Sequence, residues 1–97
     1  MPTAIEYEFV YEGRGTDEVT GETWNIDRIT RRVRISVGKT PSAYNCIYAN
    51  LVAGFRAANE EAAKGEKMSD MDIAIAAFHE TPRYLEGLTY FSVKEVK

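Results

Sequence analysis

The sequence has one cysteine, no long apolar run and no basic leader, and each shortage excludes a class of protein. Cys46 is the only cysteine in 97 residues, so no disulfide can form within the chain. No stretch approaches the roughly 20 apolar residues that cross a membrane. Residues 1–6 contain neither the basic residues nor the apolar run that open a signal peptide. These features predict a cytoplasmic protein without a membrane segment.

The usual components of catalytic and metal sites are also scarce. Cys46 and His79 are the only residues of their types, and we interpret them as a packing cysteine and a surface histidine. The scattered carboxylates show no metal-ligand spacing. Residues 37–40 imitate the end of a phosphate-binding loop, but Val33 stands where that loop needs its first glycine. The sequence therefore predicts a protein that is not an enzyme and holds no cofactor and no metal.

Positive charge is in deficit over the whole chain. Twelve lysines and arginines stand against fifteen aspartates and glutamates, which gives a net charge of −3. This balance disfavours general nucleic-acid binding, which needs a basic surface. Five of the twelve cations nevertheless fall between Arg28 and Lys39. The sequence thus concentrates its positive charge in one segment.

The first part of the chain predicts a β-hairpin. In residues 4–12 the aromatic residues fall at odd positions and the glutamates at even ones, which indicates a strand with one buried face. Residues 13–22 are rich in turn formers, and residues 23–37 are expected to form the second strand. The apolar residues of that strand change parity part-way along, so we expect a β-bulge near residues 27–28.

The middle of the chain predicts a first helix. Thr40 is a suitable N-cap, and Pro41 suits the first helical position, where a missing N–H costs nothing. Apolar residues follow helical spacing from there to Ala62. Gly65 is expected to cap this helix in the left-handed conformation.

A second helix is predicted directly afterwards. Ser69 and Asp72 fit a variant of the capping box at its start. Ile73 and the following alanines follow helical spacing on one face. We expect the buried face of this helix to be widened by three larger side chains, Met71, Ile75 and Phe78.

Pro82 is expected to end the second helix, and residues 88–96 are typical of a last strand. The predicted order is ββααβ in a single α+β domain, residues 1–97. We expect a three-stranded, mainly antiparallel sheet with two helices packed on one face. The sequence leaves open which earlier strand the last one joins.

The arginine-rich segment 28–37 poses the functional question. Three of its four arginines fall on the same face of the hairpin as the glutamates of the first strand. In one interpretation they neutralise each other, because opposite charges on neighbouring strands contribute roughly 0.2–1 kcal/mol per pair. In a second, the same face binds a partner, because arginine is enriched at interfaces. The residues concerned are Arg28, Arg32, Arg34, Glu6, Glu8 and Glu12.

Residues 32–79 support a third interpretation. A short strand followed by two helices resembles the layout of ribbon-helix-helix DNA-binding proteins. In that family two strands from a dimer enter the major groove, and the resemblance implies that Arg32, Arg34 and Ser36 would read bases. The chain departs from the family in its acidic strand at residues 4–12, which would compete for the pairing edge, and in a longer first helix.

The sequence as a whole predicts a non-enzymatic interaction protein. We expect another protein as its partner, bound through the charged sheet face or the acidic junction between the helices. Small acidic domains without catalytic chemistry are often accessory factors or inhibitors, some of them carried by phages and mobile elements. A homodimer closed through one edge of the sheet is a further prediction. Binding of duplex DNA by a dimer through the strand at residues 32–37 is the alternative.

Overall fold

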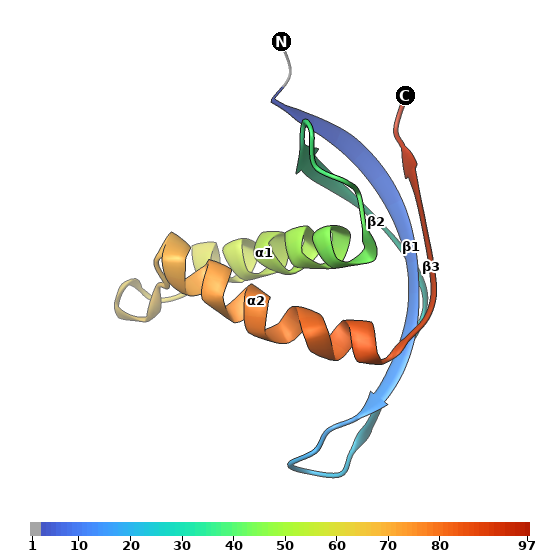
Figure 1. The fold of residues 1–97 in the computed structure, drawn as a ribbon. Helices are drawn as coiled ribbons and strands as arrows, with labels where there is room; N and C mark the ends of the chain where they lie inside the picture. The colour runs from blue at the N-terminus through green and yellow to red at the C-terminus, as the bar shows by residue number, and fades with distance from the viewer. Residues whose placement is uncertain (1–2) are drawn as a thin grey trace.

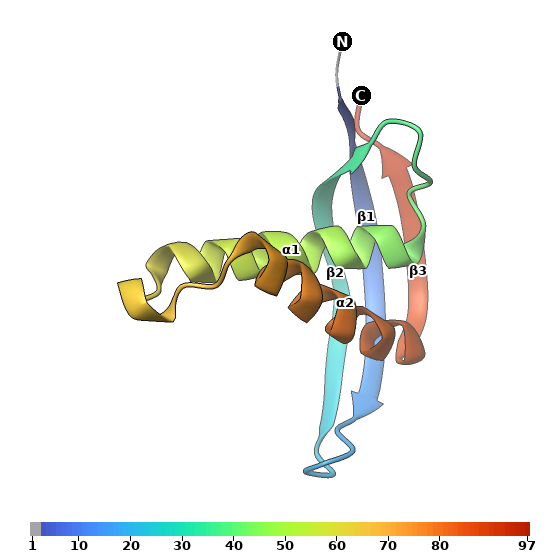
Figure 2. The same ribbon diagram turned by 60° about the vertical axis from the view of Figure 1, so that its left-hand side comes forward.

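The computed structural model describes residues 3–97, which form a three-stranded sheet and a pair of helices (Figures 1 and 2). Along the chain the elements are β1 (Ala4–Thr16), β2 (Thr23–Ser36), α1 (Ala43–Glu61), the short 3₁₀ helix η1 (Lys64–Glu66), α2 (Asp70–Glu86) and β3 (Leu88–Glu95). The predicted α+β class and the ββααβ order are confirmed.

Strand β1 lies in the middle of the sheet. The strand order is β2-β1-β3, and both pairings are antiparallel. The last strand therefore joins the first, which is the choice that the sequence left open. The register between β1 and β2 shifts after Tyr11, where Asp27 and Arg28 together oppose Glu12. This two-against-one arrangement confirms the predicted β-bulge.

The hairpin is longer than the sequence predicts. Strand β1 continues to Thr16 through residues that were expected to form a loop. Two glycines in this stretch leave room for aromatic side chains: a Cβ at Gly15 would lie 2.7 Å from the indole of Trp24, and a Cβ at Gly13 would collide with the hydroxyl of Tyr11. These glycines therefore permit close packing within a strand, where the sequence pattern suggested a turn.

Helix α1 begins two residues after the predicted start. Its N-cap is Ser42, whose Oγ accepts the backbone N–H of Asn45 at 3.1 Å, so the cap predicted at Thr40 is wrong. The predicted end is wrong too, because the helix is capped by an extended Ala62 and Gly65 lies in η1 without a positive φ. A side-chain cap thus decides the start of this helix.

Helix α2 starts as predicted but does not end as predicted. The Oγ of Ser69 accepts the backbone N–H of Asp72 at 3.1 Å. Pro82 lies inside the helix and not at its end, although proline removes one helical hydrogen bond. The last turn of α2, beyond Pro82, is stabilised by a contact with β1. The hydroxyl of Tyr11 donates a hydrogen bond to the carbonyl oxygen of Tyr84 at 3.1 Å.

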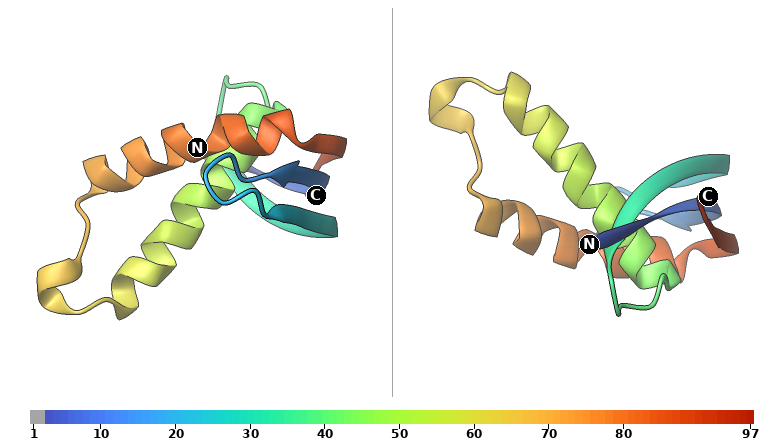
Figure 3. Two further views of the ribbon diagram at one scale, coloured as in Figure 1. Left: turned by 90° about the horizontal axis from the view of Figure 1, so that it is seen from below. Right: turned by 90° about the horizontal axis from the view of Figure 1, so that it is seen from above.

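The core lies where the inner faces of β1 and β2 meet the start of α1. Its buried side chains are Phe9, Tyr11, Val33, Ile35, Cys46 and Ile47. Both helices lie on one face of the sheet, as predicted, and then extend beyond it as a projecting pair (Figure 3). The overall extents are 45 × 37 × 19 Å. Much of the helical surface far from the sheet consequently remains exposed.

Candidate functional site

The outward face of the sheet carries ion pairs between β1 and β2 of the kind that the sequence predicts for the hairpin. The Nε of Arg28 lies 2.7 Å from Oε1 of Glu12. The guanidinium of Arg32 lies 3.7 Å from the carboxylate of Glu6 and 3.5 Å from that of Glu8. The neutralisation expected for these two arginines is confirmed. Exposed pairs of this kind contribute about 0.2–1 kcal/mol each, so they orient the side chains more than they stabilise the fold.

Arg28 also reaches across the central strand. Its guanidinium carbon lies 4.5 Å from the ring centroid of Tyr90 on β3, within the range of a cation–π contact. Tyr90 lies opposite Glu12 in the register between β1 and β3. One side chain from β2 thus contacts both other strands and helps to hold the sheet together.

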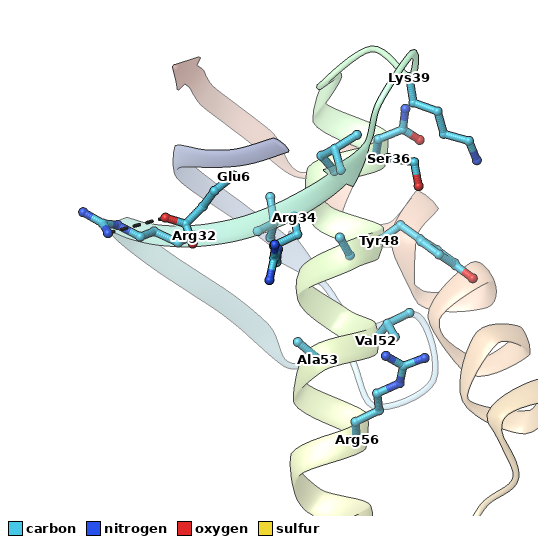
Figure 4. Close-up of a pocket in the computed structure, with 13 residues that line it drawn as sticks. Glu6, Arg32, Arg34, Ser36, Lys39, Tyr48, Val52, Ala53 and Arg56 are labelled. Carbon is cyan, nitrogen blue, oxygen red and sulfur yellow. Dashed lines mark ion pairs between the residues drawn. The ribbon is translucent and has the colours of Figure 1, made fainter. Parts of the chain in front are cut away.

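Arg34 is the arginine that the hairpin does not neutralise. Its register partner is Glu6, but the carboxylate of Glu6 contacts Arg32 instead. Arg34 forms no ion pair with any other residue in the range 3–97. Figure 4 shows Arg32 turned toward Glu6 and Arg34 leaving the strand in a different direction. The neutralisation expected for Arg34 is therefore wrong.

Arg34 instead lines a groove between β2 and α1. The groove has a volume of about 600 Å³. Its walls include residues 32–36 of β2, Glu6 of β1, Lys39 of the connecting loop, and Tyr48, Val52, Ala53 and Arg56 of α1 (Figure 4). Tyr48, Val52 and Arg56 recur every four residues, so they come from one side of the helix, and Ala53 lies next to Val52.

The groove follows the free edge of β2. Neighbouring residues of a strand point to opposite faces, so a cavity that touches all five residues from Arg32 to Ser36 must run along the edge of the strand. β2 is an outer strand, and no strand of residues 3–97 pairs with its second edge. Backbone N–H and C=O groups on such an edge are available to another extended chain.

Positive charge dominates this groove. Four cations, Arg32, Arg34, Lys39 and Arg56, stand against the single carboxylate of Glu6, although the whole chain has a net charge of −3. Lys39 and Arg56 resemble Arg34 in having no ion pair with a residue that the structure describes. The groove therefore offers three uncompensated cations to an acidic ligand.

The two sides of the groove differ in character. On the outward side of β2 lie Arg32 and Arg34, whereas the inward-facing Val33 belongs to the core. On the helical side, Val52 and Ala53 contribute apolar surface. A strand bound beside β2 would consequently meet arginines on one face and apolar groups on the other.

Part of this site lies outside what the sequence predicts. The helical spacing assigns Tyr48 to the core-facing side of α1, and nothing in the pattern brings Arg56 toward β2. The only local signal is that Arg56 is the one basic residue in α1. The packing of α1 beside the edge of β2 is what makes it part of the groove.

The two residues considered for catalysis lie in different surroundings. Cys46 is fully buried, and burial raises the pKa of its thiol to about 11. Its Sγ donates to the carbonyl oxygen of Pro41 at 3.7 Å. His79 is exposed on α2, with its ring centroid 6.0 Å from that of Phe78. At neutral pH the thiol is protonated, and a protonated thiol is a poor nucleophile.

Two further findings concern the described part of the chain. In residues 3–97 no three side chains of the types His, Cys, Asp and Glu gather closely enough to hold a metal ion. No helix within the same range is both long and apolar enough to cross a membrane.

The three side chains of β2 that the ribbon-helix-helix resemblance names as base readers lie on the outward face of the sheet. Arg32, Arg34 and Ser36 alternate along that face, where they lie beside Glu6 and Glu8 of β1.

The chain matches no protein-family model, no curated protein and no solved structure.

Proposed function

We propose that this protein is a non-enzymatic interaction domain whose groove binds an acidic, extended segment of another protein. The segment adds to the sheet as a further strand beside β2. The observation that supports this function is the position of three uncompensated cations, Arg34, Lys39 and Arg56, along an unpaired strand edge. Strand addition of this kind derives affinity from main-chain hydrogen bonds and specificity from side chains.

Strand β1 indicates which kind of segment suits β2. It pairs with the other edge of β2, and it sets glutamates beside the arginines and apolar side chains toward the core. A segment on the free edge meets the same two environments, with Arg34 on its outward side and Val52 on its inward side. We therefore expect the partner segment to alternate acidic and apolar residues.

Two other occupants fit the groove less well. A second copy of β2 would place Arg32 and Arg34 beside their own counterparts, and like charges on neighbouring strands destabilise the pairing. Duplex DNA on the outward face would bring its phosphates close to Glu8 and Glu12, which repel them. An acidic strand at the edge meets the cations and stays one strand away from those glutamates.

The experiment measures binding of a fluorescein-labelled peptide of alternating glutamate and valine by fluorescence anisotropy. The wild-type protein should bind this peptide, and the affinity should fall as salt is raised, because the cations are exposed. Arg34→Glu should weaken binding at least about tenfold, which corresponds to ~1.4 kcal/mol. A peptide of alternating lysine and valine should not bind.

The matched control is Arg14→Glu, which makes the same change in net charge outside the groove. It should leave the affinity for the acidic peptide unchanged. Absence of binding at millimolar peptide would overturn the proposal, and so would an equal loss in Arg14→Glu and Arg34→Glu. Binding of duplex DNA that depends on Arg34, without peptide binding, would favour the ribbon-like alternative.

A further inference from the structure

Helix α2 exposes an apolar stripe. Met71, Ile75 and Phe78 keep 73%, 49% and 59% of their surface accessible, and their spacing of four and three places them on one side of the helix. The buried residues Ile73 and Ala77 lie on a different side. The prediction that the three side chains widen the buried face is wrong, because α2 projects beyond the sheet (Figure 3).

Burying these three side chains against a partner would remove apolar surface from water, which favours association. The stripe is separate from the groove, because none of its residues lines the space between β2 and α1. Polar residues border it: Asp72 and His79 are both exposed. They are seven residues apart, which is close to two helical turns, so they lie on the same flank of the stripe.

We propose that the stripe docks on the same stripe of a second copy of this chain, with the two α2 helices antiparallel about a twofold axis near Ile75. In this register Ile75 packs against Ile75 of the partner subunit. Met71 packs against Phe78 of the partner subunit, and the converse contact repeats it. Each large side chain of one stripe thereby meets a large side chain of the other.

Charge complementarity selects the antiparallel arrangement. A twofold axis perpendicular to the helices brings the same flank of both copies together, so Asp72 lies beside His79 of the partner subunit twice in each dimer. An imidazole N–H can donate to a carboxylate whether the ring is neutral or charged. A parallel pair would instead place the two Asp72–His79 flanks on opposite sides of the dimer, where these contacts cannot form.

The arrangement leaves both sheets free. The C-terminal end of α2 leads directly into β3, so antiparallel helices place the two sheets at opposite ends of the pair. Each copy then keeps its groove open, and the dimer presents two grooves. This self-association rests on the stripe alone and does not depend on the function proposed for the groove.

The first test is the mass of the full chain in sedimentation velocity over a range of concentrations. The wild type should show a reversible monomer–dimer equilibrium, and Ile75→Glu should raise the dimer dissociation constant at least tenfold, because two carboxylates would meet at the axis. Val19→Glu is the matched control, since Val19 is 94% exposed in the hairpin loop. A monomeric wild type at millimolar concentration would overturn the proposal.

The second test checks the register and does not depend on the folding of the charged variant. In a Cys46→Ala background, Ile75→Cys should form a disulfide-linked dimer with diamide as oxidant, because position 75 meets itself. Met71→Cys alone should not, but a mixture of Met71→Cys and Phe78→Cys proteins should cross-link. Self-cross-linking of Met71→Cys as readily as of Ile75→Cys would indicate parallel helices and contradict the proposal.

Discussion

The arginines of β2 have different roles, and replacing them one at a time measures the difference. Arg28→Gln keeps most of the aliphatic stem but removes the 2.7 Å contact with Glu12 and the stacking on Tyr90 at 4.5 Å. Arg34→Gln removes the same charge from a side chain with no ion pair in residues 3–97. The two variants thus form a matched pair on one strand.

The expected cost follows from the two contacts of Arg28. An exposed ion pair contributes about 0.2–1 kcal/mol, and an exposed cation–π contact about 0.5–1 kcal/mol. Arg28→Gln should therefore lower the free energy of unfolding by about 1 kcal/mol, which lowers Tm by roughly 4–8 °C in a domain of this size. Arg34→Gln should stay within about 0.5 kcal/mol of the wild type.

The assay is urea unfolding followed by the fluorescence of Trp24, the only tryptophan. A double-mutant cycle with Tyr90→Leu isolates the stacking contact, for which we expect a coupling energy of about 0.5 kcal/mol. Equal destabilisation by Arg28→Gln and Arg34→Gln would refute the division of roles. A coupling energy indistinguishable from zero would refute the contact across the sheet.

Two further predictions concern the helices. Pro82→Ala should raise the free energy of unfolding by about 1–3 kcal/mol, because alanine restores the backbone N–H that the exposed proline lacks inside α2. An unchanged urea unfolding curve would contradict this prediction. Burial raises the pKa of Cys46 to about 11, so the folded state favours the protonated thiol, and this stabilisation is present at neutral pH and lost as pH rises toward about 11. Cys46→Ala should remove that alkaline loss of stability. Rapid labelling of Cys46 in the native protein by a disulfide reagent at mildly alkaline pH would contradict the burial of this thiol.

The local patterns of the sequence suffice for the buried faces of β1 and β2 and for the bulge, although not for the extension of β1 to Thr16. Alternation predicts which face of β1 is buried, and the change of parity in β2 locates the extra residue at positions 27–28. Both are properties of a few neighbouring residues, so no tertiary information is needed. The start of α2 at Ser69 is equally local, because one side-chain oxygen satisfies a helical N–H.

Contacts between distant residues decide what the sequence misses. Proline predicts the end of a helix, but the contact of Tyr11 with Tyr84 holds the turn beyond Pro82. The register allows Glu6 to contact either Arg32 or Arg34, and only the arrangement of the side chains shows that it contacts Arg32. The groove requires α1 to lie beside the edge of β2, which no periodicity encodes.

Strand addition beside β2 can be observed residue by residue in NMR spectra of the ¹⁵N-labelled protein with the peptide of alternating glutamate and valine. If the peptide adds as a strand, amides of residues 32–36 should shift, and those on the free edge of β2 should gain protection from hydrogen exchange. The facing side of α1, from Tyr48 to Arg56, should shift with them. Changes confined to β3 or to the outward face of the sheet, with the amides of residues 32–36 unaffected, would contradict the addition of a strand beside β2.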